Sequence, residues 1–217
     1  EGLKLKEAGQ YDAAFDAFSH CLAIDSTDAA VRYELCMFYM QLNKPEKAIE
    51  VLKPAVEHRP DQFEYRMAFA SISRSLGMFG EAAEAYRALV KDFPQKKELN
   101  YYLADALTQA GEIGEAIDAL NVLEERVGMN EALSMQKYRL YSQLEQPEKA
   151  FKEIEKLATK FPMEARYPLI MGDLHLEKGE LEQALACYQK AHAIDPSNPY
   201  YIVSMANYYE ASGDKEA

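Results

Sequence analysis

The sequence predicts an all-α fold, a solenoid of about thirteen helices in antiparallel pairs. The main observation is an alanine that recurs every 34 residues without a slip. The recurrent residues are Ala14, Ala48, Ala82, Ala116, Ala150 and Ala184. A fixed period of this length indicates one helical hairpin copied in tandem, and each copy is too small to bury its apolar face alone. The copies must therefore stack on their neighbours.

Two further observations mark the ends of the helices within each repeat. We number each repeat so that the recurrent alanine is position 20. Position 15 mostly holds residues that tolerate the left-handed conformation at the end of a first helix, namely Gly9, Asn43, Gly77, Gly111, Glu145, Gly179 and Gly213. Position 32 stops the second helix with Ser26, Pro60, Pro94, Gly128, Pro162 and Pro196. These signals predict short helices.

The repeats follow one another in a single predicted array over 1–217. Complete repeats run over 29–62, 63–96, 97–130, 131–164 and 165–198, with partial repeats at 1–28 and 199–217. The first helix of a repeat begins after a capping residue, as at Asp28, Asn130 and Asn198. Pro199 follows the last of these, at a helical position where a missing N–H costs nothing.

Within each repeat, small residues at positions 8 and 20 are expected to let the two helices approach closely. Position 8 holds Gly2, Cys36, Ala70, Ala104, Gly172 and Ala206. Position 24 carries the large residues Phe18, Leu52, Tyr86, Leu120, Ile154 and Tyr188. Burying each of these side chains stabilises the fold by about 1.5–3 kcal/mol. Position 24 should therefore connect consecutive repeats.

Two places depart from the pattern. The repeat 131–164 has Lys137 at position 7, Tyr138 at the small position 8 and Glu145 in place of glycine. We expect its first helix to be shifted or rotated. Pro54 lies midway along a predicted second helix and should bend it locally.

Composition excludes several classes of protein. The chain is 48% hydrophobic and 28% charged, and it has no run of about 18 apolar residues, so neither membrane insertion nor disorder is expected. A net charge of −12 opposes binding to nucleic acid or anionic lipid, since both require clustered Lys and Arg. We attribute the acidity to solubility.

The sequence predicts no catalytic, metal or cofactor site. The three cysteines lack a CxxC spacing, and Cys21 and Cys36 are interpreted as buried small hydrophobic residues. The histidines lack paired ligand spacing; His175 is expected to be half-buried and hydrogen-bonded, whereas His58 and His192 should be solvated. No phosphate-binding loop, nucleophile elbow or HExxH motif occurs.

The repeat closely resembles the tetratricopeptide repeat (TPR) family along the whole chain. The family pattern Gly-x-Tyr/Phe-x-x-Ala-x-x-x-Phe/Tyr appears as Gly9, Tyr11, Ala14 and Phe18, and again as Gly77, Phe79, Ala82 and Tyr86. The family's Trp at position 4 is missing throughout. The resemblance implies a right-handed superhelix whose concave groove is lined by first helices, with positions 2, 5, 9, 12 and 13 pointing inward.

Transferred onto this chain, those positions give the predicted partner-binding residues. Position 5 is apolar in six first helices, as Tyr33, Met67, Tyr101, Met135, Leu169 and Val203. Nearby positions add Met37, Met40 and Tyr200, together with the charged Arg74, Asp105, Arg139, Arg166 and Asp173. We predict a noncatalytic scaffold that binds a peptide or protein segment through this Tyr- and Met-rich wall.

Alternatives stay open at this point. The position 5 residues are equally well explained as an extension of the core. Arg139 and Arg166 are more readily explained by ion pairs with nearby acidic residues than by a partner. The family subgroup that holds chaperone tails uses Lys at position 5 and Asn at position 9, which this chain lacks, so that function is not expected.

Two other functions are considered. The first is a regulatory or substrate-docking array of an enzyme whose catalytic domain lies outside 1–217, because the sequence lacks an initiator Met and reads as an excised piece. The second is self-association through exposed repeat ends. The compartment is undetermined, and both the cytoplasm and the periplasm fit the sequence.

Overall fold

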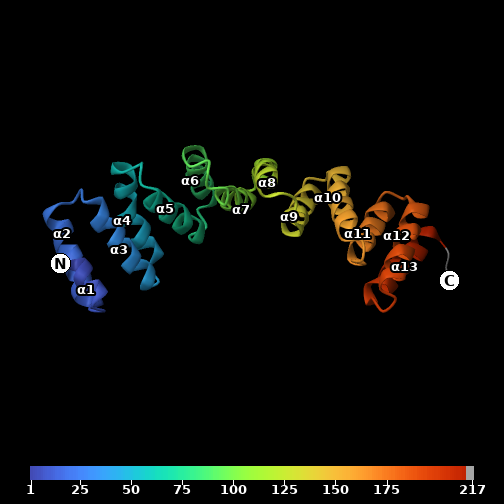
Figure 1. Ribbon diagram of the computed structural model, residues 1–217, viewed down its shortest axis with the longest axis horizontal. Helices are drawn as coiled ribbons and strands as arrows, with labels where there is room; N and C mark the ends of the chain where they lie inside the picture. The colour runs from blue at the N-terminus through green and yellow to red at the C-terminus, as the bar shows by residue number, and fades with distance from the viewer. Residues whose placement is uncertain (214–217) are drawn as a thin grey trace. The chain divides into compact units, whose positions relative to one another are not determined.

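The computed structural model describes residues 1–213, and within that range it contains thirteen α-helices and no strand (Figure 1). The helices are α1 (Gly2–Glu7), α2 (Tyr11–Ile24), α3 (Ala29–Gln41), α4 (Pro45–His58), α5 (Phe63–Ser75), α6 (Phe79–Asp92), α7 (Leu99–Ala110), α8 (Ile113–Val127), α9 (Glu131–Gln143), α10 (Pro147–Lys160), α11 (Arg166–Glu177), α12 (Leu181–Ile194) and α13 (Pro199–Ser212). The prediction of an all-α fold with about thirteen helices is confirmed.

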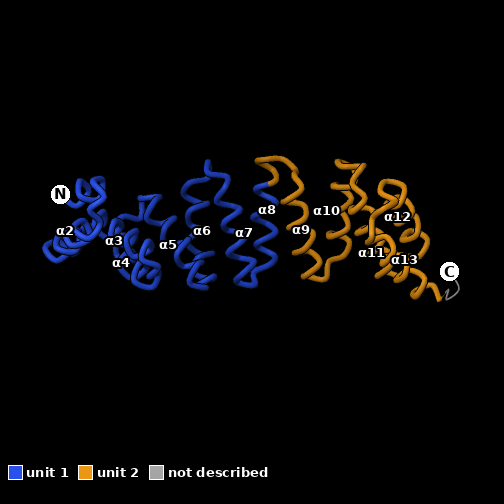
Figure 2. The backbone as a smooth tube through the Cα atoms, turned by 90° about the horizontal axis from the view of Figure 1, so that it is seen from below, with its two compact units in different colours: residues 1–123 blue, residues 124–217 orange. Residues whose placement is uncertain are grey.

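The chain forms two compact units, residues 1–123 and residues 124–217, which Figure 2 colours separately. We call them unit 1 and unit 2. In unit 1, α1 pairs with α2, α3 with α4, and α5 with α6. In unit 2, α9 pairs with α10 and α11 with α12, and α13 packs on both α11 and α12. The single array over 1–217 stays a prediction.

The turns between paired helices adopt the predicted left-handed backbone. Gly77 has a φ of 75° and Gly111 a φ of 84°. The same conformation occurs at position 15 even where glycine is absent, with φ of 53° at Asn43 and 54° at Glu145. A residue with a Cβ is disfavoured in this region, and asparagine tolerates it better than glutamate does. Glu145 therefore carries local strain.

Replacing Glu145 with glycine should relieve this strain. We expect Glu145→Gly to raise the free energy of unfolding by about 0.5–1 kcal/mol, after the entropy that glycine adds to the unfolded chain is subtracted. Asn43→Gly is the matched control and should give a smaller gain. Urea denaturation followed by circular dichroism measures both. A loss of stability in Glu145→Gly would contradict this explanation.

The predicted helix starts are confirmed by hydrogen bonds that the side chains of the capping residues accept from backbone N–H groups. The Asp28 carboxylate accepts from the backbone N–H groups of Ala30 and Val31 at 3.0 and 3.1 Å. Asn130 caps α9 and Asn198 caps α13 in the same way. At the other departure from the pattern, α4 continues without interruption through Pro54. The bend expected there stays a prediction.

The side chains at position 24 lie in the core, as predicted. Two of them also lie against a glycine at position 8. All six position 24 side chains and all six recurrent alanines are buried. A Cβ added to Gly172 would lie 2.4 Å from the Tyr188 ring, and one added to Gly2 would lie 2.7 Å from the Phe18 ring. Position 8 was expected to lie against the alanine at position 20. The structure shows that these glycines make room for an aromatic ring.

The cysteines differ from the prediction in one case. Cys36 is buried and Cys21 is exposed, so the interpretation of Cys21 as a buried residue is wrong. Position 27 is buried in the other five second helices, whereas the corresponding face of α2 is not covered in that way. Burial also raises the pKa of the Cys36 thiol to about 12.

This difference predicts selective thiol chemistry. Iodoacetamide at mildly alkaline pH should modify Cys21 quickly and leave Cys36 intact, because Cys36 is both inaccessible and protonated. In urea the two thiols should react at similar rates. Mass spectrometry of tryptic peptides measures the two rates. Equal rates in the folded protein would contradict the packing of α3.

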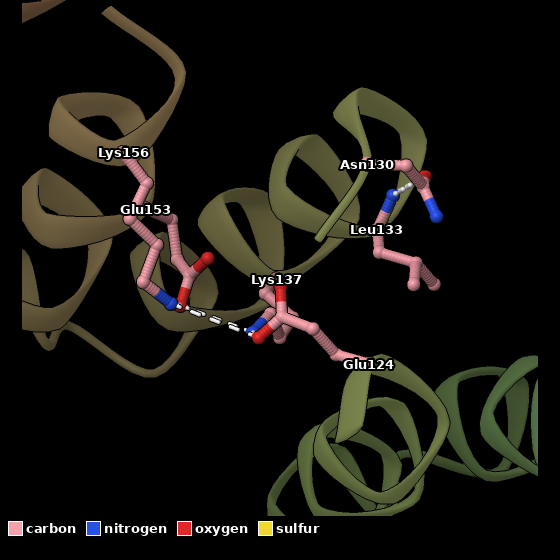
Figure 3. A network of polar contacts seen from close by, with 6 residues as sticks. All are labelled: Glu124, Asn130, Leu133, Lys137, Glu153 and Lys156. Carbon is pink, nitrogen blue, oxygen red and sulfur yellow. Dashed lines mark hydrogen bonds and ion pairs between the residues drawn. The ribbon is translucent and has the colours of Figure 1, made fainter. Parts of the chain in front are cut away.

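A buried ion network joins the repeat 131–164 to Glu124, near the end of the preceding repeat. Lys137 is 1% exposed, and its Nζ lies 2.6 Å from Glu124 Oε2 and 3.2 Å from Glu153 Oε1. Lys156 joins the same two carboxylates from the more exposed side (Figure 3). Tyr138, at the small position 8, is only partly buried. Within unit 2, the network joins Glu124 to one residue of α9 and one of α10, at positions where other repeats mostly use apolar residues.

Candidate partner-binding surface

The first candidate site lies in unit 1, where residues from α3 and α5 line a pocket of about 420 Å³. We call it pocket A. It is lined by Tyr33, Met37, Met40, Phe63, Glu64, Met67, Ala68, Ser71 and Ile72. Four of these, Tyr33, Met37, Met40 and Met67, were predicted as partner-binding residues. Both helices are the first helices of their repeats, so positions 5, 9 and 12 of neighbouring repeats converge here.

The walls of pocket A combine flexible and rigid groups. Three methionines supply thioethers that adapt to different shapes. The Tyr33 ring is fixed by the Tyr65 ring, at a centroid distance of 4.9 Å. Burial, followed by the nearby Cys36, Glu34 and Glu64 groups, raises the pKa of Tyr33. Its hydroxyl therefore stays protonated and can donate a hydrogen bond to a partner.

Predicted site residues on α5 and α7 form a separate exposed cluster in unit 1. Tyr101 is 50% exposed, and its ring meets that of Tyr102 edge to face. Arg74 Nη1 lies 3.0 Å from Asp105 Oδ2, with both side chains partly exposed. The two charged residues therefore satisfy each other. An exposed pair of this kind contributes only about 0–1 kcal/mol, so a partner can displace it at little cost.

The second candidate site lies in unit 2, where α11 and α13 line a pocket of about 320 Å³. We call it pocket B. It is lined by Arg166, Leu169, Ile170, Asp173, Asn198, Tyr200, Val203, Ser204 and Asn207. Five of these, Arg166, Leu169, Asp173, Tyr200 and Val203, were predicted. Pocket B is more polar in its residues than pocket A.

The charged groups of pocket B are already engaged within unit 2. Asp173 Oδ1 accepts hydrogen bonds from the Tyr188 hydroxyl at 2.8 Å and from the Ser204 hydroxyl at 3.2 Å. Arg166 Nη2 lies 2.6 Å from Glu131 Oε1. The prediction that Arg166 pairs with a neighbouring acid is confirmed. Arg139 is exposed, and no ion pair joins it to another residue of the range 1–213.

One predicted site residue is largely buried. Leu169 lines pocket B, but it is only 5% exposed, and it belongs to the same core cluster of unit 2 as Ala165 and Tyr188. It therefore offers little surface to a partner, as the explanation of position 5 as part of the core expects. Met135 is half-buried against another part of that core. Val203, at the same repeat position, is 58% exposed.

The side chains at position 5 therefore differ in exposure, and they lie neither all in the groove nor all in the core. Its side chains are half-buried at Tyr33, Met67 and Met135 and exposed at Tyr101 and Val203. The pockets also include residues that sequence reasoning missed, such as Phe63 at position 1 and Ile72 at position 10. The family pattern gives no signal for these positions. Phe63 and Ile72 are apolar and lie next in sequence to positions 2 and 9, and this was the only indication that they line a pocket.

The histidines are placed as predicted. His175 is partly buried, bonds through Nδ1 to the Glu180 carboxylate and packs edge to face on Phe151. His58 and His192 are exposed, and the His192 ring stacks on the Tyr201 ring at a centroid distance of 4.4 Å.

None of the helices in residues 1–213 combines the length and the apolar composition that a membrane span requires.

Comparison with known proteins identifies the repeat. Models of the tetratricopeptide repeat match residues 5–72 and 67–128, and a TPR repeat model matches residues 172–213. A curated relative, cellulose synthase operon protein C of Pseudomonas fluorescens (strain SBW25), is 25% identical over 192 residues. That match covers 82% of this chain and 15% of the relative.

Solved structures share the fold at low sequence identity. Naa15/Naa10 bound to HypK-THB matches with a TM-score of 0.80 and 16% identity, over 99% of this chain and 34% of that one. YrrB, described as a TPR protein with an unusual peptide-binding site, matches with a TM-score of 0.60 and 17% identity. The match covers 88% of this chain and 98% of YrrB. MamA from Desulfovibrio magneticus RS-1 matches with a TM-score of 0.57 and 18% identity, over 79% of this chain and 97% of the MamA chain. The chain thus spans about a third of the first structure and a smaller part of the curated relative.

Proposed function

This chain belongs to the tetratricopeptide repeat family, and we propose that it binds a peptide or protein segment of a partner on the exposed face of its first helices. Repeats of this family indicate a protein-interaction scaffold. Such scaffolds are typically noncatalytic. Pocket A has the main binding role, with Tyr101 as a further exposed contact in unit 1. Tyr200 and Val203 belong to pocket B of unit 2, which we treat as a separate site.

One observation carries this proposal. Tyr33, Met37, Met40 and Met67, chosen by repeat position alone, line one pocket rather than four unrelated patches. Tyrosine offers a large contact area at a low entropy cost, and methionine repacks around different shapes. Central apolar contacts of this kind supply about 2 kcal/mol or more each when they act as hot spots. YrrB is a TPR protein described as binding peptides, which supports a peptide as the class of partner.

A random-peptide phage library panned against the chain provides the probe for the test. The affinity of the selected peptides is then measured by fluorescence anisotropy for the wild type and for Tyr33→Ala/Met67→Ala. We expect the double variant to bind about a hundredfold more weakly or worse, since two hot-spot contacts are lost. If the double variant loses the helical circular dichroism spectrum of the wild type, Met67→Gln replaces it in the test, because this change keeps most of the side-chain volume.

The matched control is Ile24→Ala/Met163→Ala, which removes two apolar side chains that are 76% and 77% exposed outside both pockets. It should bind the selected peptides like the wild type. Peptides that bind the Tyr33→Ala/Met67→Ala and Met67→Gln variants as tightly as the wild type would rule out pocket A.

A second candidate is a docking array within a longer protein. It is favoured by the match to cellulose synthase operon protein C, in which the region similar to this chain is 15% of the relative. The open reading frame around this sequence tests it, because an appended catalytic domain would support this candidate. Self-association through exposed residues such as Ile202 of α13 stays a prediction, which concentration-dependent light scattering tests.

A further inference from the structure

We propose that the segment bound in pocket A places a lysine or arginine side chain against Glu64, next to the apolar residue that fills the pocket. This inference rests on the proposed function and adds the chemistry of the partner. It concerns charge, which the family pattern does not specify at this position.

Glu64 is the one charged residue among those that line pocket A. It is exposed, and no ion pair joins it to any residue of the range 1–213. Three other carboxylates on or beside the first helices of unit 1 have cationic partners. Glu34 lies 2.6 Å from Lys6, Asp92 lies 2.7 Å from Arg66 and Asp105 lies 3.0 Å from Arg74. Glu64 is thus a negative charge at the pocket without a cation of its own.

The negative charge of Glu64 reaches the tyrosines beside it. Burial chiefly raises the pKa of Tyr65; the Arg59 charge opposes this shift, and the charges of Asp28, Glu64 and Glu34 add to it. Glu64 acts likewise on Tyr33, which lines the pocket. A cationic side chain that enters pocket A would be attracted by the Glu64 carboxylate, whereas an acidic side chain would be repelled by it. The net charge of −12 makes a second copy of this chain a poor occupant.

The walls of pocket A suit the rest of a lysine or arginine side chain. Both side chains pack their methylene groups along apolar surfaces while the charged group stays near water. The methionines offer such a surface, and aromatic faces attract cations. Within this chain, Lys96 already packs in this way, with its Nζ 4.3 Å from the centroid of the Phe63 ring. A cation beside this wall of the pocket is therefore sterically and chemically acceptable.

Pocket B does not offer an equivalent charge. Its carboxylate, Asp173, already accepts two hydrogen bonds, from Tyr188 and Ser204. Its cation, Arg166, lies against Glu131. An ionic group of a partner would have to displace these contacts. Pocket A therefore selects for a basic residue more strongly than pocket B does.

The test uses peptides selected from the random phage library and three synthetic versions of one of them. In the first version the basic residue is retained, in the second it is norleucine, which keeps an apolar stem without charge, and in the third it is glutamate. Each peptide is titrated against the wild type, Glu64→Gln and Glu64→Lys. Glu57→Lys is the matched control, because it makes the same charge change at an exposed residue that does not line pocket A.

We expect the selected peptides to be enriched in Lys and Arg. Glu64→Gln should weaken binding of the basic peptide about threefold to fivefold, as an exposed ion pair does, and Glu64→Lys should weaken it more. The glutamate peptide should bind Glu64→Lys better than it binds the wild type. Added NaCl should reduce these differences. Glu57→Lys should bind like the wild type.

The outcomes separate this inference from the proposed function. Selected peptides without basic residues, or equal affinity of the basic peptide for the wild type and Glu64→Lys, would overturn the role of Glu64. If those same peptides still lose affinity in Met67→Gln, pocket A remains the binding site. If they bind Met67→Gln as tightly as the wild type, the proposed function fails as well.

Discussion

Lys137→Ala is expected to lower the free energy of unfolding by about 3–5 kcal/mol, the largest effect that we predict for a single charged residue. Lys137 is 1% exposed and lies against Glu124 and Glu153, which are themselves 19% and 6% exposed. Removing the ammonium leaves two largely buried carboxylates without that partner. Lys156 still contacts both carboxylates, but it is 44% exposed and compensates their buried charge only in part. Urea denaturation monitored by circular dichroism measures the loss.

Two controls identify the cause. Lys156→Ala removes a cation that contacts the same carboxylates but is 44% exposed, so it should cost less than about 1 kcal/mol. The triple change Lys137→Leu/Glu124→Val/Glu153→Ala introduces residues that other repeats use at these positions. It should be neutral or stabilising, as with other buried ion pairs replaced by apolar residues. A cost for Lys137→Ala no greater than that for Lys156→Ala would contradict the assigned burial.

Tyr188→Ala is expected to cost about 3–5 kcal/mol, as do other large-to-small changes of buried aromatic residues. The Tyr188 ring is fully buried, and Gly172 lies against it so closely that no Cβ would fit there. Its hydroxyl donates a hydrogen bond to Asp173, which lines pocket B. Removing the side chain would therefore leave a cavity under α11 and release one wall of the pocket. Thermal unfolding by calorimetry measures the change.

Tyr188→Phe separates packing from hydrogen bonding. It keeps the ring and removes only the hydroxyl, so we expect a smaller cost, about 1–2 kcal/mol. Ser204 would remain as a donor to Asp173. If Tyr188→Phe costs as much as Tyr188→Ala, the hydrogen bond rather than the filled space dominates, which contradicts the packing explanation.

Much of the fold could be predicted because its determinants are local. The helix start at Asp28 and the left-handed turn at Gly77 each depend on a few consecutive residues, and the 34-residue period repeats such signals along the chain. Even Glu145 adopts the left-handed turn of its repeat, because the neighbouring helices require a reversal at that point. Local signals and the period agreed in most repeats, which is why the helix starts and the turns could be predicted.

The errors arose where burial depends on neighbouring helices. Cys21 was expected to be buried and is exposed. Leu169 was predicted to face a partner, and it lines pocket B with only 5% of its surface exposed. The partners of Lys137 were also missed. Glu124 and Glu153 replace residues that are mostly apolar at the same positions of other repeats, so three linked departures from the period were the available signal.

The candidate site was predicted only in part for the same reason. Repeat position identified Tyr33, Met37, Met40 and Met67, because the same face of every first helix is repeated. It could not identify Phe63, since this side chain reaches the pocket from the start of α5 rather than from its middle. Pocket shape depends on side-chain size at several positions at once.

Photo-crosslinking tests the central claim, that a partner segment binds in pocket A, most directly. Met40→p-benzoylphenylalanine places the crosslinker in pocket A, and Met163→p-benzoylphenylalanine places it at an exposed residue outside both pockets. With a peptide selected from the phage library, irradiation should give a covalent adduct from the Met40 variant, and unlabelled peptide should suppress it. Adducts from the Met163 variant alone, with none from the Met40 variant, would contradict the claim.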